Sequence, residues 1–130
     1  MTDKLTDFRQ LNVWQKAHKL VLEIYDLTKK FPKDERGELA SRMRNTACDI
    51  PIQIAQGFMR RSPKDKTVAY KGTLESIESL KYQVILSQDL DYIKGNEPLL
   101  EAIEEVGRML TGLVRSVRME GPSHHDRDDE

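Results

Sequence analysis

Residues 97–118, EPLLEAIEEVGRMLTGLVRSVR, contain the clearest periodicity in the chain. Their apolar side chains recur at alternating steps of four and three residues, at Leu99, Ile103, Val106, Leu110, Leu113 and Val117. That spacing places them along one face of a helix, in a heptad-like seam. Acidic residues occupy the first turns and basic residues the last turns, which suits the helix dipole. The stretch therefore predicts an amphipathic helix that packs against other helices.

Three stretches upstream have the same helical spacing, and no alternation typical of strands competes with them. They predict helices over residues 13–30, 35–60 and 63–91, before the helix at 97–118. Four helices of similar length with short connections favour an all-α, antiparallel up-down-up-down four-helix bundle over residues 1–119. A flatter helical array is the alternative. Pro51 lies inside the second helix and should kink it, because proline removes a backbone hydrogen bond.

Some helix ends have sequence signals of their own. Asn12, followed three residues later by Gln15, fits a capping box at the start of the first helix. Ser62 before Pro63 is typical of the start of the third helix. Asn96 is the expected cap of the last helix.

Composition limits the classes of protein to consider. The 130 residues are 38% apolar and 33% charged, which predicts one folded domain. The formal charge of −1 excludes a generally polybasic nucleic-acid binder. The single Cys permits no internal disulfide, and residues 50–59 form the longest uncharged run, too short to cross a membrane. With no signal sequence at the start, we expect a cytoplasmic protein without a membrane partner.

The charge is unevenly distributed along the chain. Residues 120–130, EGPSHHDRDDE, hold five acidic residues and one basic residue, and no apolar residue. We expect this acidic tail to be disordered. Residues 36–71 hold eight basic and three acidic residues, so the basic charge is local.

No catalytic motif is present in the sequence. Glu-x-x-His pairs, which hold metals in bundles, and glycine-rich phosphate loops are both missing. Cys48 lies beside Asp49, whose charge opposes thiolate formation, so a buried apolar role is favoured over a nucleophile. The pair His124 and His125 lies in the tail, where nothing fixes ligand geometry. We therefore predict no enzymatic activity, no cofactor, no metal and no small-molecule substrate.

The first two helices each have a second apolar stripe, turned away from the predicted core. On a helical wheel these residues project about 120–200° from the core direction. Matching stripes on adjacent helices, one with the only Trp, predict a subunit interface, although wide helices in a small bundle can also bury two stripes. The stripes are Trp14, His18, Leu22 and Tyr25 on the first helix and Cys48, Ile52, Ala55 and Met59 on the second.

Two polar features are candidates for binding. The second helix has a polar row at Asn45, Asp49, Gln53 and Gln56, which suits a partly buried polar seam or wet pocket and equally an ordinary solvated face. Six basic residues could contact phosphates, and a ring of subunits would repeat them around one face. A solvated turn is the alternative for a single subunit. They are Arg42, Arg44, Arg60, Arg61, Lys64 and Lys66.

Four blocks of the sequence together resemble a known family. They are VWQKAH at residues 13–18, FPKDE at 31–35, IPIQIAQG at 50–57 and GRMLTGLVRS at 107–116. In order and spacing they resemble the bacterial four-helix-bundle proteins encoded within 23S ribosomal RNA intervening sequences. The resemblance covers about residues 8–118.

This resemblance implies a cytosolic bundle that assembles as a ring-like homopentamer and has no known catalytic residues. It also implies a distant likeness to the accessory subunit of diversity-generating retroelements, which works with a reverse transcriptase and nucleic acid. The family's Ser-Ile-Pro-x-Asn-Ile-Ala-Glu-Gly appears here as residues 49–57, DIPIQIAQG, with three polar positions changed. Its Arg on the same helix appears as Asn45, and its Ser-x-x-Glu as Ser76 and Ser79. These departures would alter a binding surface built from those positions.

Three functional hypotheses follow. The first is a non-enzymatic homo-oligomer, pentameric by the resemblance, that contacts RNA or a nucleoprotein complex electrostatically through the six basic residues. The second is a protein-binding scaffold or adaptor with no nucleic-acid role. A small-molecule enzyme is the third and least favoured.

Overall fold

A computed structural model describes residues 5–95 and 97–124. This part of the chain is all helical, without strands. Its long helices are α1 (Asn12–Thr28), α3 (Ser41–Met59), α4 (Pro63–Asp89) and α5 (Glu97–His124). Shorter helical pieces precede α1 and α3: η1 (Phe8–Gln10), α2 (Lys33–Glu35) and η2 (Arg36–Ala40), of which η2 is a π-helix.

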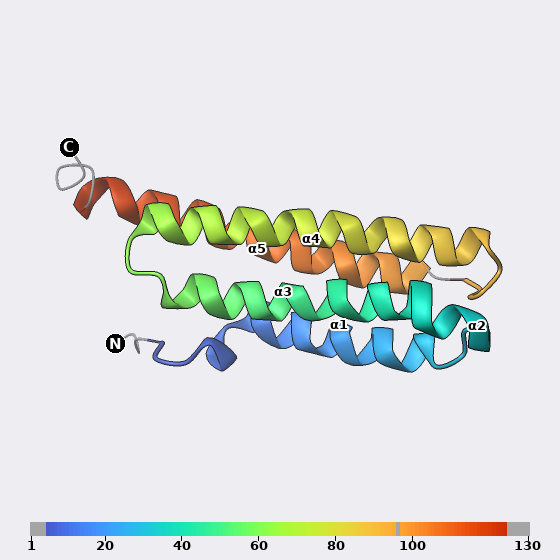
Figure 1. The fold of residues 1–130 in the computed structure, drawn as a ribbon. Coiled ribbons are helices and arrows are strands. Elements are labelled where there is room, and N and C mark those ends of the chain that lie inside the picture. Colours follow the sequence, from blue (N-terminus) through green and yellow to red (C-terminus); the bar gives the residue numbers. More distant parts are fainter. Residues whose placement is uncertain (1–4, 96, 125–130) are drawn as a thin grey trace.

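The long helices run antiparallel to one another along the chain (Figure 1). α1 packs on α3, α3 on α4 and α4 on α5, and α5 returns to contact α1. This last contact closes the arrangement into a four-helix bundle, as predicted, and rules out the flatter array. The turn between α3 and α4 lies at the same end of the bundle as both termini, whereas α2 and the α4–α5 connection lie at the opposite end (Figure 1).

The core is formed by one face of each long helix. Val13, Ala17, Leu20 and Ile24 of α1 are buried, as their helical spacing requires. Burying each large aliphatic side chain contributes about 1.5 to 3 kcal/mol. The other helices supply the buried residues Leu39, Ala40, Met43, Ala47, Ile50, Ile54, Tyr70, Ile77, Leu80, Val84, Ile103, Val106, Leu110 and Val114.

The buried face of α4 includes polar residues. Thr73 and Ser87 are fully buried beside Ile77 and Leu80. Each hydroxyl donates to a backbone carbonyl one turn earlier, Thr73 to Ala69 at 3.1 Å and Ser87 to Gln83 at 2.8 Å. These bonds satisfy the hydroxyls and allow their burial.

The helix ends differ in how well they follow the sequence signals. Ser62 caps α4 as predicted, since its Oγ accepts from the Asp65 amide at 3.0 Å and Pro63 comes first in the helix. Asn12 is not a cap: α1 begins after Leu11, and the capping box lies earlier, between Asp7 and Gln10 of η1. Buried Leu11 and the short η1 helix set where α1 begins. The cap predicted at residue 96 lies outside the described residues.

Two helix boundaries also differ from those predicted. The helical run expected over 35–60 is divided into α2, η2 and α3, because π-helical turns interrupt the α-helical bonding at residues 36–40. Pro51 is buried within α3, and the kink there stays a prediction. α5 continues to His124, past the expected end at Arg118 and into the tail expected to be disordered; residues 125–130 lie outside the described residues.

Candidate functional site

The six predicted nucleic-acid contacts fall into two groups at opposite ends of the bundle. Arg42 and Arg44 lie in the first turn of α3, whereas Arg60, Arg61 and the residues after them follow its last turn. The intervening helix separates Arg42 from Arg60 by about 27 Å, at about 1.5 Å per residue. The structure therefore does not bring all six together.

Arg44 is held against α1. Its Nε donates to Thr28 Oγ1 at 2.8 Å, and its guanidinium lies 4.7 Å from the centre of the Tyr25 ring. The neighbouring Arg42 pairs with Glu38 at 3.7 Å on the surface. Arg44 thus joins α1 to α3, and its donor groups are partly used within the fold.

Lys66 also has a structural role. Its Nζ donates to the carbonyls of Phe58 at 2.7 Å and Gly57 at 3.4 Å, at the end of α3. The same ammonium lies 5.3 Å from the centre of the Phe58 ring, and partial burial lowers the pKa of Lys66. A cation at this position satisfies the Phe58 carbonyl, which the helix end leaves without a backbone donor, and adds to the Arg60 amide that already reaches Gly57.

Three of the six predicted residues remain as an exposed basic group. Arg60 and Arg61 lie on the turn between α3 and α4, and Lys64 follows in the first turn of α4, all with exposed side chains. None of them forms an ion pair or a side-chain hydrogen bond with the residues that the structure describes. We call this end of the molecule the basic end.

The structure adds three basic residues to the basic end. Lys71 of α4 and Arg115 and Arg118 of α5 line a groove of about 570 Å³ between the two helices. Lys71 belongs to the base-rich segment of the sequence, but the two arginines were explained there by the helix dipole alone. Arg115 and Arg118 are three residues apart, which places them on neighbouring turns of one helix face. That spacing is the sequence signal that could have indicated a shared basic surface.

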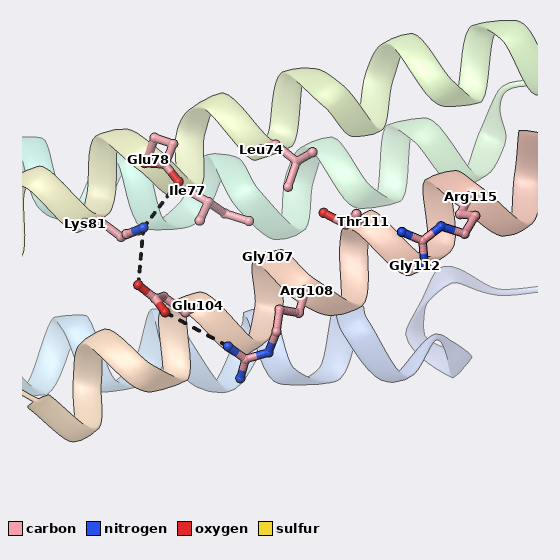
Figure 2. Close-up of a pocket in the computed structure, with 10 residues that line it drawn as sticks. All are labelled: Leu74, Ile77, Glu78, Lys81, Glu104, Gly107, Arg108, Thr111, Gly112 and Arg115. Atoms are coloured by element: carbon pink, nitrogen blue, oxygen red, sulfur yellow. Dashed lines mark hydrogen bonds and ion pairs between the residues drawn. The ribbon is translucent and has the colours of Figure 1, made fainter.

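The groove continues along α4 and α5 into a second hollow of about 540 Å³, and the two share Leu74, Thr111 and Arg115. Figure 2 shows Lys81 and Arg108 of this second hollow paired with glutamates, whereas Arg115 has no partner among the residues drawn. Lys81 lies 3.4 Å from both Glu78 and Glu104, and Arg108 lies 2.9 Å from Glu101. Although desolvation opposes it, pairing with Glu104 and Glu78 raises the pKa of Lys81. Two of the three basic residues here are therefore paired with acids, unlike those at the basic end.

The two apolar stripes form one face across α1 and α3. Trp14 of α1 is half-buried between Phe8 and His18, with ring centres 5.2 Å from each. Farther along, the Tyr25 hydroxyl lies 3.9 Å from Cys48 Sγ, and this hydrogen bond raises the pKa of Tyr25.

Several side chains of this α1–α3 face stay at the surface. Leu22 is 57% exposed, Ile52 49% and Met59 74%, and His18 is also exposed. Cys48 and Ala55 are half-buried beside them. Trp14 and Cys48 pack against the core, while Leu22, Tyr25, Ile52 and Met59 leave apolar surface exposed on both helices.

The predicted polar row does not form one seam. Asn45, Asp49 and Gln56 are exposed, whereas Gln53 is half-buried and accepts a hydrogen bond from Ser76 Oγ of α4 at 3.0 Å. The polar seam of the structure lies between α3 and α4 and includes residues the sequence did not indicate. Gln83 Nε2 donates to Thr46 Oγ1 at 3.1 Å, and the buried Gln83 Oε1 has no protein partner.

The described residues include neither a metal site nor a membrane-spanning helix. Among residues 5–95 and 97–124, no cluster of His, Cys, Asp and Glu could hold a metal ion. The described helices include none that is both long and apolar enough to cross a bilayer.

Comparison with known proteins identifies a family. The family model described as 23S rRNA-intervening sequence protein matches residues 9–112, from η1 into the middle of α5. No curated protein matches the chain. The family match spans the α1–α3 face and the segment that carries Arg60, Arg61 and Lys64.

Proposed function

Since the chain belongs to the family of 23S rRNA-intervening sequence proteins, we propose that it is a non-catalytic RNA or nucleoprotein interaction module that works as a homo-oligomer. The observation that carries this proposal is the exposed basic group of Arg60, Arg61 and Lys64 where α3 leads into α4, which has no ion-pair partner among the described residues. Exposed cations without acidic partners are free to meet phosphates and release counterions.

A different surface, the α1–α3 face, supports self-association. The α1–α3 face exposes Leu22, Ile52 and Met59 beside Trp14, on helices that are already neighbours. We propose that a second copy of the chain covers this face, within the pentameric ring that the family resemblance implies. A closed ring would repeat the basic end once per subunit, so that weak phosphate contacts add up.

Within this proposal the basic residues have different roles. Arg60, Arg61 and Lys64 contact phosphates, while Arg44 and Lys66 hold the bundle together through Thr28 and Phe58. Arg42 lies at the opposite end and contributes only through general charge. The RNA backbone is then recognised electrostatically. Aromatic side chains, on which unpaired bases stack, do not alternate with these basic residues in the sequence.

The test is the affinity for a fluorescent single-stranded RNA, measured by anisotropy. The triple variant Arg60→Ser, Arg61→Ser and Lys64→Ser should bind at least tenfold more weakly than the unaltered protein. The matched control, Lys29→Ser, Lys30→Ser and Lys33→Ser, removes the same charge at the opposite end. It should bind nearly as well as the unaltered protein. Equal losses in both variants would contradict a localised RNA surface.

The exposed α1–α3 face also favours a second candidate, a scaffold that docks another protein. Capture of partners from a lysate before and after nuclease treatment separates the two. Partners that remain after complete RNA digestion, together with no RNA bound in the anisotropy assay, would support the scaffold.

A further inference from the structure

The groove between α4 and α5 changes in charge along its length. In the half drawn in Figure 2, Lys81 and Arg108 are neutralised by glutamates. In the half at the basic end, the described lining contains Lys71, Arg115 and Arg118 but no acidic residue. These three side chains have no ion-pair partner among the residues that the structure describes.

The chain itself supplies charges of the opposite sign close to this half of the groove. Residues 125–130, HDRDDE, contain four acidic residues and one basic residue. They follow directly on His124, where α5 ends, and Arg118 is six residues earlier in the same helix. The net charge of −3 on this acidic segment matches the three unpaired cations of the groove.

The acidic segment is long enough to reach these cations. From His124 back to Arg118 is about 9 Å along the helix, and to Arg115 about 14 Å, at about 1.5 Å per residue. Six extended residues span about 20 Å. Asp128, Asp129 and Glu130 can therefore turn back to the groove without any change in the bundle.

We propose that residues 126–130 dock in the basic half of the α4–α5 groove of their own chain, with their carboxylates against Lys71, Arg115 and Arg118. The groove also offers an apolar floor from Leu74 and Val114, which excludes water from one side of these pairs. The docked segment covers cations at the basic end, so an anionic partner must displace it. The docking itself holds whether or not RNA is that partner.

The experiment is zero-length cross-linking of the full chain with a water-soluble carbodiimide. This reagent joins a lysine amine to a carboxylate in direct contact and takes up the released water as a urea. We expect an amide between Lys71 and Asp126, Asp128, Asp129 or Glu130, identified by peptide mass. Its yield should be at least fivefold above that of the same carboxylates with Lys64, the exposed lysine on the neighbouring turn.

Two controls make the result decisive. Arg115→Ala with Arg118→Ala leaves Lys71 in place and should lower the yield of its cross-link several-fold. The cross-linked chain should run at the monomer mass on a denaturing gel, because the contact is within one chain. Equal cross-linking of Lys64 and Lys71, an unchanged yield in the double variant, or cross-links confined to dimers would each overturn the proposal.

Discussion

Gly57 lies where α3 packs tightly against α4. A Cβ atom added there would lie 2.5 Å from Tyr70 Cε1 and 3.2 Å from the Cβ of Ala69. Tyr70 is buried and cannot move away freely. At Gly112 of α5, by contrast, an added Cβ would meet nothing within 4 Å. A larger side chain therefore clashes at Gly57 but has room at Gly112.

Substitution of each glycine by alanine tests this difference. Gly57→Ala should lower the free energy of unfolding by about 1 to 3 kcal/mol, because overpacking forces side chains out of their rotamers. Gly112→Ala should raise it by up to about 1 kcal/mol through helix propensity. Urea denaturation measures both, and a neutral Gly57→Ala would show that α3 and α4 are farther apart than described.

Lys66 and Lys64 lie two residues apart but have different roles. Lys66→Met should destabilise the fold by about 1 to 2 kcal/mol, because the carbonyls of Phe58 and Gly57 lose a charged donor. Lys64→Met should leave stability within about 0.5 kcal/mol, as is usual for exposed side chains. Thermal or urea unfolding measures the free energy of unfolding of both variants. Equal values for the two would refute a capping role for Lys66.

At the scale of the helices, the interface between α3 and α4 depends on paired polar groups. Thr46→Val leaves Gln83 Nε2 without its acceptor and should cost about 1 to 3 kcal/mol. Thr46→Val combined with Gln83→Leu removes both partners and the unpaired Gln83 Oε1, so the double variant should be more stable than the single one. A double-mutant cycle from urea unfolding measures the coupling, and simple additivity would contradict the bond.

The helices most accurately predicted were those with a strong apolar stripe. α1 and α5 bury most of the expected faces, because the spacing of Leu, Ile and Val along them reports the core; in α5, however, Val114 is buried and the predicted Leu113 only half-buried. α4 was predicted less fully, since its buried stripe includes Tyr70, Thr73 and Ser87. Thr and Ser can be buried when their hydroxyls donate to carbonyls of their own helix. A pattern of apolar residues does not predict such positions.

The candidate site was predicted only in part, for reasons of tertiary structure. Arg60, Arg61 and Lys64 lie exposed where α3 leads into α4, as adjacency in sequence suggested. The roles of Arg44 and Lys66 depend on contacts with Tyr25 and Phe58, which belong to other turns or helices. Lys71, Arg115 and Arg118 meet only because α4 and α5 pack antiparallel, which no local pattern reveals.

At the scale of the whole molecule, the proposed self-association depends on the α1–α3 face. Ile52→Asp places a charge in the middle of this face and should dissociate the assembly into single chains, because burying an unpaired charge is costly. Val68→Asp is the matched control, since Val68 is 66% exposed on α4, outside this face. Native mass spectrometry counts the subunits.

The outcome of that measurement is unambiguous. The unaltered protein and Val68→Asp should share one oligomeric mass, while Ile52→Asp appears at the mass of one chain. A monomeric unaltered protein, or an Ile52→Asp variant that assembles normally, would contradict the assignment of this face.

The most direct test of the central claim is the salt dependence of RNA binding, measured between about 50 and 200 mM salt. Each phosphate contact contributes about −0.7 to the slope of log K against log salt for single strands. The account predicts a steep negative slope for the unaltered protein. Removing Arg60, Arg61 and Lys64 should make the slope shallower by about 2 if each contacts one phosphate. A slope near zero, or one unchanged by this triple substitution, would contradict an RNA surface at the basic end.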